Sequence, residues 1–235
     1  MIIAGHCLYT HKCKKDNILK TFHDLKGFAT HFRIKLWGGG TTYKKYTEGV
    51  GENGVPLLKE INETFPCGTE VRTPGQVDLC KELDYLWIGA RSSQNYDLLE
   101  HIGKEYPGQI MIKRGFGMTI DEVIGIDEIM RLKYNREVYI IERGINTFDR
   151  GHYRWSPDLK GLIRLKHDYS KLFDRTVVDC SHSAESWTYV PDTYKAFKSI
   201  GVKHFMFECY SNLNFANADQ HQAITVDELK RILEV

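Results

Sequence analysis

The sequence has no hydrophobic run long enough to span a membrane. Its longest apolar stretches, such as Tyr85 to Ile88 and Val138 to Ile141, are much shorter than a membrane-crossing helix requires. No positively charged leader with an apolar segment precedes the first strand-like residues, Met1 to Ala4. We therefore expect a cytoplasmic protein that is neither secreted nor inserted in a membrane.

An excess of charge of one sign is also missing. The 32 Lys and Arg residues nearly balance the 31 Asp and Glu residues, which gives a formal net charge of +1. This balance argues against a general role in binding nucleic acid or another polyanion. It leaves room for a local cluster of positive charge in a cleft.

Paired cysteine motifs, internal repeats and low-complexity segments are absent too. Scattered cysteines without a CxxC pair predict reduced thiols rather than a disulfide framework. The chain has 235 residues, which fit one domain with a sizeable core, so we expect a single domain over 1–235 without a regulatory extension. The six cysteines are Cys7, Cys13, Cys67, Cys80, Cys180 and Cys209.

Short apolar runs alternate with longer amphipathic stretches along the chain. Most of these runs lack strict alternation of apolar and polar residues, which is typical of parallel strands buried on both faces. Eight strands are predicted: Ile2–Ala4, Phe32–Trp37, Thr69–Val71, Tyr85–Ile88, Gln109–Ile112, Val138–Ile141, Thr176–Val178 and His204–Phe207.

Helix-like segments lie between the predicted strands. Thr119 followed by Glu122 indicates a capping box at the start of one of them. Eight strands alternating with helices favour an α/β fold, a single (β/α)8 TIM barrel. An open doubly wound sheet is the alternative, but no glycine-rich dinucleotide-binding turn follows the first strand. The predicted helices include Asn17–Leu25, Val55–Glu63, Tyr96–Lys104, Ile120–Leu132 and Val226–Leu233.

Side chains that bind metals stand at the ends of three predicted strands. Cys7 follows the first strand, His182 follows the seventh, and Glu208 follows the eighth. The carboxyl ends of the strands meet at one end of a barrel, where catalytic groups gather. Thiolate, imidazole and carboxylate ligands together suit a divalent cation such as zinc, manganese or iron.

Four cationic side chains are expected at the same end of the barrel. Without anionic partners these charges would repel one another, so a bound anion should neutralise them. A phosphate together with a carboxylate meets this need. The four residues, late in or just after the second, fourth, fifth and sixth strands, are Arg33, Arg91, Lys113 and Arg143.

Each of these residues also has an ordinary structural explanation when it is taken alone. A buried cysteine is usually a small apolar filler. His182 could be a hydrogen-bonded structural residue, and Glu142 and Arg143 could form an adjacent ion pair. The prediction of an active site therefore depends on all of these residues together, because a barrel places the ends of its strands at one common end.

A series of motifs runs in order over nearly the whole chain. These are IAGHC at 3–7, IGARSSQNYDLL at 88–99, IKRG at 112–115, ERGINTF at 142–148, YRWSPDL at 153–159 and VDCSHSA at 178–184. The series resembles IAGPC, IGARNMQNFELL, LKRG, ERGIRTFE, TRNTLDL and VDPSHATG of the metal-dependent 3-deoxy-7-phosphoheptulonate (DAHP) synthases. That family is related to the 3-deoxy-octulosonate phosphate and sialic acid synthases.

The resemblance implies a transferase of aromatic amino acid biosynthesis, in the shikimate pathway. Such an enzyme joins phosphoenolpyruvate to an aldose, erythrose 4-phosphate in the family, and releases phosphate. A homo-oligomer is expected by analogy. The resemblance also implies that phosphoenolpyruvate is held by Arg33, Arg91, Lys113 and Arg143. A divalent metal ion (Mn, Zn, Fe or Co) is then expected on Cys7, His182, Glu208 and Asp219.

The expected reaction is an aldol-like condensation in which the metal polarises the aldehyde oxygen. Lys113 or His182 is the expected proton donor or relay, and the sequence does not choose between them. Two alternatives remain open: a sister synthase that uses another aldose, and a catalytically silent barrel that binds a phosphorylated metabolite or a partner protein.

The chain departs from the family pattern after the second strand. Gly38-Gly39-Gly40 stands where the family has Lys-Pro-Arg, whose lysine reaches the reacting centre and whose arginine holds the phosphate of erythrose 4-phosphate. His6 replaces the proline of IAGPC, and Glu185 replaces the glycine of HATGK. We therefore expect erythrose 4-phosphate to be a poor substrate or to be held by other residues, with Lys35, Lys44 and Lys45 as candidates.

Overall fold

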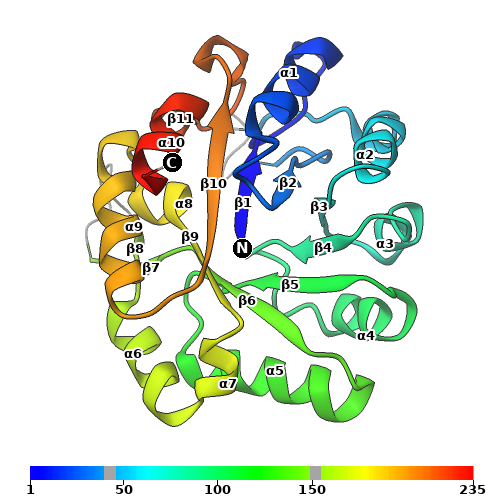
Figure 1. Cartoon of the computed structure of the whole chain (residues 1–235). Helices are drawn as coiled ribbons and strands as arrows, with labels where there is room; N and C mark the ends of the chain where they lie inside the picture. Colours follow the sequence, from blue (N-terminus) through cyan, green and yellow to red (C-terminus); the bar gives the residue numbers. More distant parts are fainter. Residues whose placement is uncertain (40–45, 149–154, 235) are drawn as a thin grey trace.

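Eight parallel strands close into a barrel in the structure, a computed structural model that describes residues 1–39, 46–148 and 155–234. The last barrel strand pairs with the first, with Ile2 opposite Phe205 and Gly5 opposite Glu208, which closes the ring. Figure 1 shows these strands at the centre of the molecule. They are β1 Ile2–Gly5, β2 His31–Arg33, β3 Cys67–Val71, β4 Tyr85–Ile88, β5 Gln109–Lys113, β6 Val138–Glu142, β9 Thr176–Asp179 and β10 His204–Tyr210.

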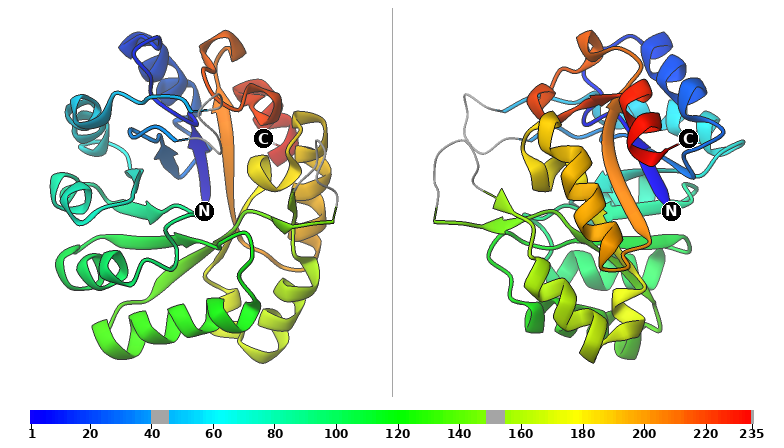
Figure 2. Two further views of the ribbon diagram at one scale, coloured as in Figure 1. Left: turned by 180° about the vertical axis from the view of Figure 1, so that it is seen from behind. Right: turned by 60° about the vertical axis from the view of Figure 1, so that its left-hand side comes forward.

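Helices surround the barrel on the outside (Figure 1). The two views of Figure 2 show the same ring from behind and from the side. The helices are α1 Lys15–Leu25, α2 Val55–Asn62, α3 Pro74–Leu79, α4 Tyr96–Glu105, α5 Ile120–Tyr134, α6 Leu159–Asp168, α7 Ser170–Phe173, α8 Cys180–Ala184, α9 Val190–Ser199 and α10 Val226–Leu233. This arrangement confirms the predicted (β/α)8 fold.

Two of the strands end more than one residue away from the predicted end. β2 stops at Arg33, whereas the prediction extended to Trp37. Beyond Arg33 the chain leaves the barrel register, and Lys35 forms an isolated parallel bridge with Leu8 while its carbonyl accepts a 2.8 Å hydrogen bond from the N–H of Tyr9. β10 extends to Tyr210, so Glu208 lies inside this strand.

Within the described ranges, three short strands lie outside the barrel ring. β7 (Ile145–Asn146) pairs antiparallel with β8 (Trp155–Ser156), and β11 (Ile224–Thr225) pairs parallel with the end of β10. The right-hand view of Figure 2 shows β7 projecting from the body of the barrel. The pairing of Asn146 with Trp155 places Trp155 next to the chain that leaves β6.

Apolar side chains fill two concentric layers. The inner layer occupies the barrel interior and includes Ile3 of β1, Trp87 of β4, Met111 of β5 and Met206 of β10, all with 0% exposure. A larger layer packs the outer faces of the strands against the helices. Because both faces of each strand are covered, the strands read as continuous apolar runs.

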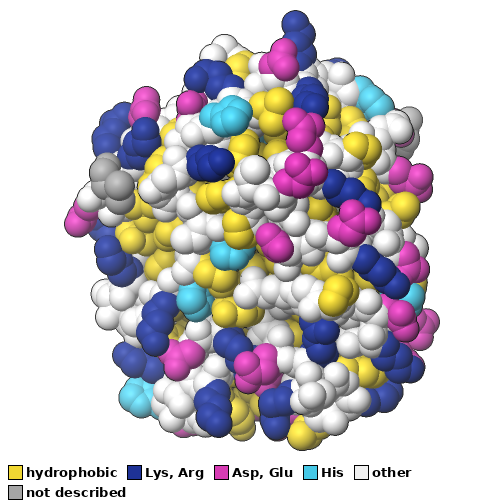
Figure 3. All heavy atoms as spheres, turned by 45° about the vertical axis from the view of Figure 1, so that its right-hand side comes forward, with side chains coloured by type: hydrophobic (Ala, Val, Ile, Leu, Met, Phe, Trp, Pro, Cys, Tyr) yellow, Lys and Arg dark blue, Asp and Glu magenta, His cyan; other side chains and the backbone are white. Residues whose placement is uncertain are grey.

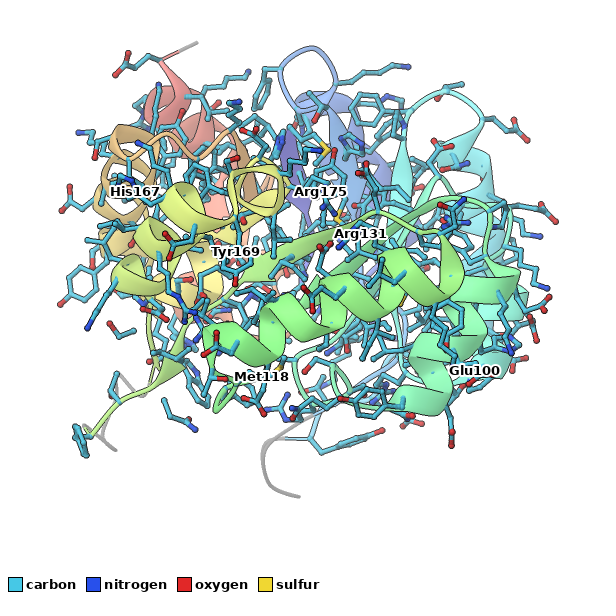
Figure 4. The ribbon with its side chains drawn as sticks, turned by 90° about the horizontal axis from the view of Figure 1, so that it is seen from below. Glu100, Met118, Arg131, His167, Tyr169 and Arg175 are labelled. Atoms are coloured by element: carbon cyan, nitrogen blue, oxygen red, sulfur yellow. The ribbon has the colours of Figure 1, made fainter. Side chains whose placement is uncertain are left out.

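The start of α5 confirms the predicted capping box. The hydroxyl of Thr119 accepts a hydrogen bond from the N–H of Glu122, and the Glu122 carboxylate accepts one from the N–H of Thr119. Figure 4 shows α5 on the outside of the barrel, between α4, which carries Glu100, and the region of His167 and Tyr169.

Charges of both signs cover the outside of the molecule. On the face shown in Figure 3, Lys and Arg side chains are interspersed with Asp and Glu side chains, in keeping with the near-zero net charge. Among the described residues, no helix has the length and apolar character that crossing a membrane requires.

Candidate active site at the strand ends

The structure brings the predicted site residues together at the carboxyl ends of the strands. A cavity of about 560 Å³ opens there. Glu208 is fully buried next to this cavity, with 0% exposure. The other seven predicted residues line it: Cys7, Arg33, Arg91, Lys113, Arg143, His182 and Asp219.

The four potential metal ligands form one cluster. Cys7 follows β1, His182 lies in α8 directly after β9, Glu208 lies in β10, and Asp219 follows β10. One ligand atom from each residue lies within 4.8 Å of those of the other three. The Cys7 thiol points at the Asp219 carboxylate, with Sγ 3.5 Å from Oδ2. A thiol, an imidazole and two carboxylates at this spacing match the ligands of borderline divalent cations.

Burial controls the protonation of the Cys7 thiol. Its pKa lies well above the usual value, first because it is buried and then because the Glu208 and Asp219 carboxylates are close. The pKa of Asp219 moves the other way. Burial alone would raise it, but the nearby His182, the hydrogen bond from Cys7 and the charge of Lys35 lower it.

Asp179 anchors both a potential metal ligand and a cation. Its Oδ2 atom accepts hydrogen bonds from Nδ1 of His182 (2.8 Å) and from Nζ of Lys113 (2.7 Å). Although burial would raise its pKa, the charges of His182 and Lys113 bring the pKa of Asp179 well below its usual value. A proton on Nδ1 leaves the Nε2 lone pair of His182 free to bind a metal.

Glu208 is held by a carboxamide and faces two positively polarised groups. Its Oε2 atom accepts a hydrogen bond of 2.7 Å from Nε2 of Gln222. Its Oε1 atom lies 3.3 Å from Nε2 of His182 and 3.6 Å from Nη2 of Arg33. Within the described part of the chain this oxygen has no hydrogen-bond partner, although it is buried. A bound cation would satisfy it.

Arg33 places unsatisfied donors in the barrel mouth. The residue is 1% exposed, and its guanidinium lies 5.3 Å from the ring of Trp87. Its Nε and Nη1 atoms have no hydrogen-bond partner among residues 1–39, 46–148 and 155–234. Buried N–H groups without partners are costly, so these donors indicate a site for an anionic ligand.

Aromatic rings hold Arg143 in place. Its guanidinium lies 4.7 Å from the ring of Phe116 and 4.9 Å from the ring of Trp155, and these two rings stack with 4.2 Å between centroids. The guanidinium of Arg91 also lies near Phe116, 5.2 Å from the centre of its ring. Burial lowers the pKa of Arg143, and its Nη1 atom has no hydrogen-bond partner within the described residues.

The adjacent pair Glu142 and Arg143 does not form the ion pair that the sequence left open. Glu142 instead accepts hydrogen bonds from Nη1 of Arg114 (3.0 Å) and from the N–H of Gly144 (2.7 Å). Arg114 also binds Asp158 at 2.8 Å. Arg114 therefore has a structural role, whereas Arg143, the sequence neighbour of Glu142, lines the cavity.

Two departures from the family pattern are accommodated locally. Glu185 adopts φ 54°, a left-handed conformation that favours the glycine of the family, and its carboxylate accepts a hydrogen bond of 3.0 Å from the N–H of Trp155. His6 is buried beside Thr21, with 2.9 Å between Nε2 and Oγ1. Burial and the charge of Arg33 lower the pKa of His6 to about 3.

Sequence reasoning missed several polar residues of the site. Asp179 lies in the VDCSHSA motif but was given no role, although its spacing of three from His182 was the available signal. Gln222, Glu70 and Arg72 line the cavity and carried no motif of their own. Lys35 lines the cavity as well, whereas the candidates Lys44 and Lys45 lie outside the described residues.

The strand ends of this parallel barrel bring potential metal-binding side chains next to a group of Arg and Lys. This combination is typical of metabolic enzymes with anionic substrates. The model of the DAHP synthetase I family matches residues 1–235, so the chain belongs to that family. It is therefore a phosphoenolpyruvate-dependent synthase of the aldolase type, a transferase-type enzyme.

Relatives with assigned names cover almost the whole chain. The chain is 28% identical over 242 residues to the phospho-2-dehydro-3-deoxyheptonate aldolase of Thermotoga maritima, covering 99% of this chain and 68% of the relative. It is 25% identical over 253 residues to the 2-dehydro-3-deoxyphosphooctonate aldolase of Bartonella henselae, covering 99% and 87%. The crystal structure of the Thermotoga maritima DAHP synthase matches with a TM-score of 0.87 at 25% identity, covering 100% of this chain and 67% of that one.

Proposed function

We propose that this enzyme condenses phosphoenolpyruvate with a phosphorylated aldose, releases inorganic phosphate and depends on a divalent metal ion. The observation that carries the proposal is one shared cavity of about 560 Å³, which joins the Cys7 cluster to the cationic group. Erythrose 4-phosphate, the aldose of the family, is the first substrate to test. With that substrate the enzyme would serve aromatic amino acid biosynthesis.

The cluster of Cys7, His182, Glu208 and Asp219 fits a divalent ion in three ways. The donor set suits Mn, Zn, Fe or Co, Oε1 of Glu208 lacks a partner in the described chain, and Asp179 fixes the ring of His182. When bound, such an ion supplies a Lewis acid that polarises the aldehyde oxygen.

The cationic group suits phosphoenolpyruvate, which carries a phosphate and a carboxylate. Arg33 and Arg143 offer buried N–H donors without partners among the described residues, and Arg91 and Lys113 line the same cavity. Preorganised charges of this kind neutralise the substrate and fix its direction of approach. The aromatic rings of Phe116 and Trp155 keep Arg143 in position before the substrate arrives.

The reaction forms one carbon–carbon bond. Carbon 3 of phosphoenolpyruvate attacks the aldehyde carbon, water adds at carbon 2, and the bond from carbon 2 to the phosphate oxygen breaks to leave a ketone and inorganic phosphate. The former aldehyde oxygen takes up a proton. Lys113 is the better donor, because Nδ1 of His182 is bonded to Asp179 and its Nε2 faces the metal cluster.

A sister synthase with a different aldose is the second candidate. The absence of Lys and Arg from Gly38-Gly39-Gly40 favours it, since the family uses those charges for erythrose 4-phosphate. The likeness to a 2-dehydro-3-deoxyphosphooctonate aldolase supports it as well. Both candidates share phosphoenolpyruvate and differ only in the partner aldehyde.

The test is phosphate release from phosphoenolpyruvate with a panel of aldoses. The enzyme is purified without chelator, its metal content is measured, and each aldose is added with and without EDTA treatment. We expect phosphate release that needs the metal and at least one aldose. A protein that binds metal and phosphoenolpyruvate but releases no phosphate with any aldose is instead the silent barrel.

A further inference from the structure

Two cations outside the proposed phosphoenolpyruvate group face the cavity from neighbouring strands. Lys35 follows β2, Arg72 follows β3, and these strands pair through Phe32 with Cys67 and Arg33 with Gly68. Both side chains line the cavity. They therefore add positive charge at the side of the barrel mouth next to the glycine loop.

The charged ends of Lys35 and Arg72 both lie close to Gly39. A Cβ atom at Gly39 would lie 3.6 Å from Nζ of Lys35 and 3.8 Å from Nη1 of Arg72. Two backbone hydrogen bonds with Thr47, of 3.1 and 3.2 Å, fix Gly39 at this place. Lys35 and Arg72 thus place positive charge beside Gly39, in the segment where the family has charged residues and this chain has glycines.

One carboxylate balances these two cations only in part. Oε1 of Glu70 lies 4.0 Å from Nζ of Lys35, and Oε2 accepts a hydrogen bond from Nε1 of Trp87. Burial would raise the pKa of Glu70, but the charges of Lys35, Lys113 and Arg72 lower it. The side chain of Arg72 has no ion pair or hydrogen bond within the described residues, so one positive charge is left for a ligand.

Lys35 also lies near the metal cluster. Its charge acts on both the Cys7 thiol and the Asp219 carboxylate. In the ring of strands, β2 and β3 stand between β1, which leads to Cys7, and β4, which leads to Arg91. An aldose with its aldehyde at the cluster can therefore extend its far end toward Lys35 and Arg72.

We propose that Lys35 and Arg72 bind the phosphate group of the aldose, replacing the charges that Gly38-Gly39-Gly40 lacks. The inference rests on the proposed function and deepens it, because it selects phosphorylated over neutral aldoses. The guanidinium of Arg72 binds phosphate oxygens through paired N–H donors, and the ammonium of Lys35 adds a point charge.

The test compares erythrose 4-phosphate with erythrose in the metal-loaded enzyme. Losing a charge-assisted hydrogen bond to phosphate weakens binding by roughly ten- to a hundredfold. Arg72→Ala and Lys35→Ala should each raise KM for erythrose 4-phosphate by that factor, with KM for phosphoenolpyruvate nearly unchanged. The preference over erythrose should shrink by the same factor, and Arg72→Lys should recover part of it. Arg131 is an exposed arginine of α5 (Figure 4), and Arg131→Ala is the matched control.

Binding separates this inference from the proposed function. If no aldose is turned over, the proposed function fails, and titration of inorganic phosphate into protein loaded with metal and phosphoenolpyruvate tests the pair by itself. Weaker phosphate binding in Arg72→Ala than in Arg131→Ala supports the pair. An unchanged preference and unchanged phosphate binding in both Arg72→Ala and Lys35→Ala overturn it. So does a loss of preference that appears only in Lys44→Ala combined with Lys45→Ala.

Discussion

Nζ of Lys113 lies 2.7 Å from Oδ2 of Asp179, deep in the barrel mouth, where both residues are almost fully buried. The same oxygen holds Nδ1 of His182 at 2.8 Å. One carboxylate therefore orients a cation of the phosphoenolpyruvate group and a ligand of the metal cluster. The two halves of the proposed site are coupled through it.

Asp179→Asn should weaken metal binding by roughly 10- to 100-fold, because groups that orient a metal ligand contribute about this much. The amide keeps the shape of the carboxylate but loses the charge that pairs with Lys113 and His182. Affinity is measured by competition with a chelator. Asp174→Asn, which removes only an exposed pair with Lys203, is the control and should keep the parent affinity. Equal affinities in both variants would refute the role of Asp179.

Cys7→Ala should abolish stoichiometric metal binding and activity without unfolding the protein. The thiol lies in the cluster with Asp219, and a methyl group offers no ligand. Cys13→Ala is the matched control, since Cys13 is also a buried thiol but its Sγ atom lies 3.8 Å from a backbone carbonyl, that of Lys14, rather than in the cluster. Metal content by elemental analysis, together with circular dichroism, decides the outcome. A Cys7→Ala protein that retains one metal per chain contradicts the assignment.

Arg91→Ala should weaken phosphoenolpyruvate binding by about ten- to a hundredfold, the effect of losing a charged hydrogen bond of about 1.5–3 kcal/mol. The guanidinium lines the cavity beside Phe116. Calorimetry on the metal-loaded protein measures the change. Arg164→Ala removes an exposed arginine that pairs with Asp121 and should leave the affinity unchanged. An unchanged affinity in Arg91→Ala places the substrate elsewhere.

Stability should fall as the pH drops from about 6.5 toward 4 because of His31. Burial, the N-terminal ammonium group and His204 lower the pKa of His31 to about 4. The unfolded chain therefore binds more protons than the folded protein in that window, which favours unfolding. The contribution is below about 1.4 kcal/mol per pH unit, since His31 is only partly buried.

Urea unfolding of His31→Gln at pH 6.5 and 5 measures this contribution. The variant should lose less stability between the two pH values than the parent does. His167→Gln, at an exposed position of α6, is the control and should follow the parent. A His31→Gln protein with the same loss as the parent shows that His31 does not carry the effect.

The strands and the main site residues could be predicted because burial on both faces leaves continuous apolar runs, such as Tyr85–Ile88. The barrel then places the residue after each run at one end, which is why Cys7 and Arg91 were found without coordinates. The end of β2 was not predictable, because apolar residues continue after Arg33 whereas Lys35 pairs with Leu8 outside the barrel register.

Contacts between side chains from distant segments could not be read from the sequence. Asp179 stands beside a predicted ligand, but nothing in the motif shows that it also reaches Lys113. The partner of Glu142 is Arg114 rather than its neighbour Arg143, a choice that depends on where the guanidinium groups point. The convergence of Lys35 and Arg72 at Gly39 likewise needs the spacing of β2 and β3.

The most direct measurement of the central claim is the mass of the product made from phosphoenolpyruvate labelled with carbon-13 at all three carbons. The metal-loaded enzyme, labelled phosphoenolpyruvate and erythrose 4-phosphate or another phosphorylated aldose are incubated together. The account predicts one sugar acid that contains all three labelled carbons and the whole aldose, formed in equal amount with inorganic phosphate. Phosphate without a labelled condensation product, or no reaction with any aldose tested, would contradict it.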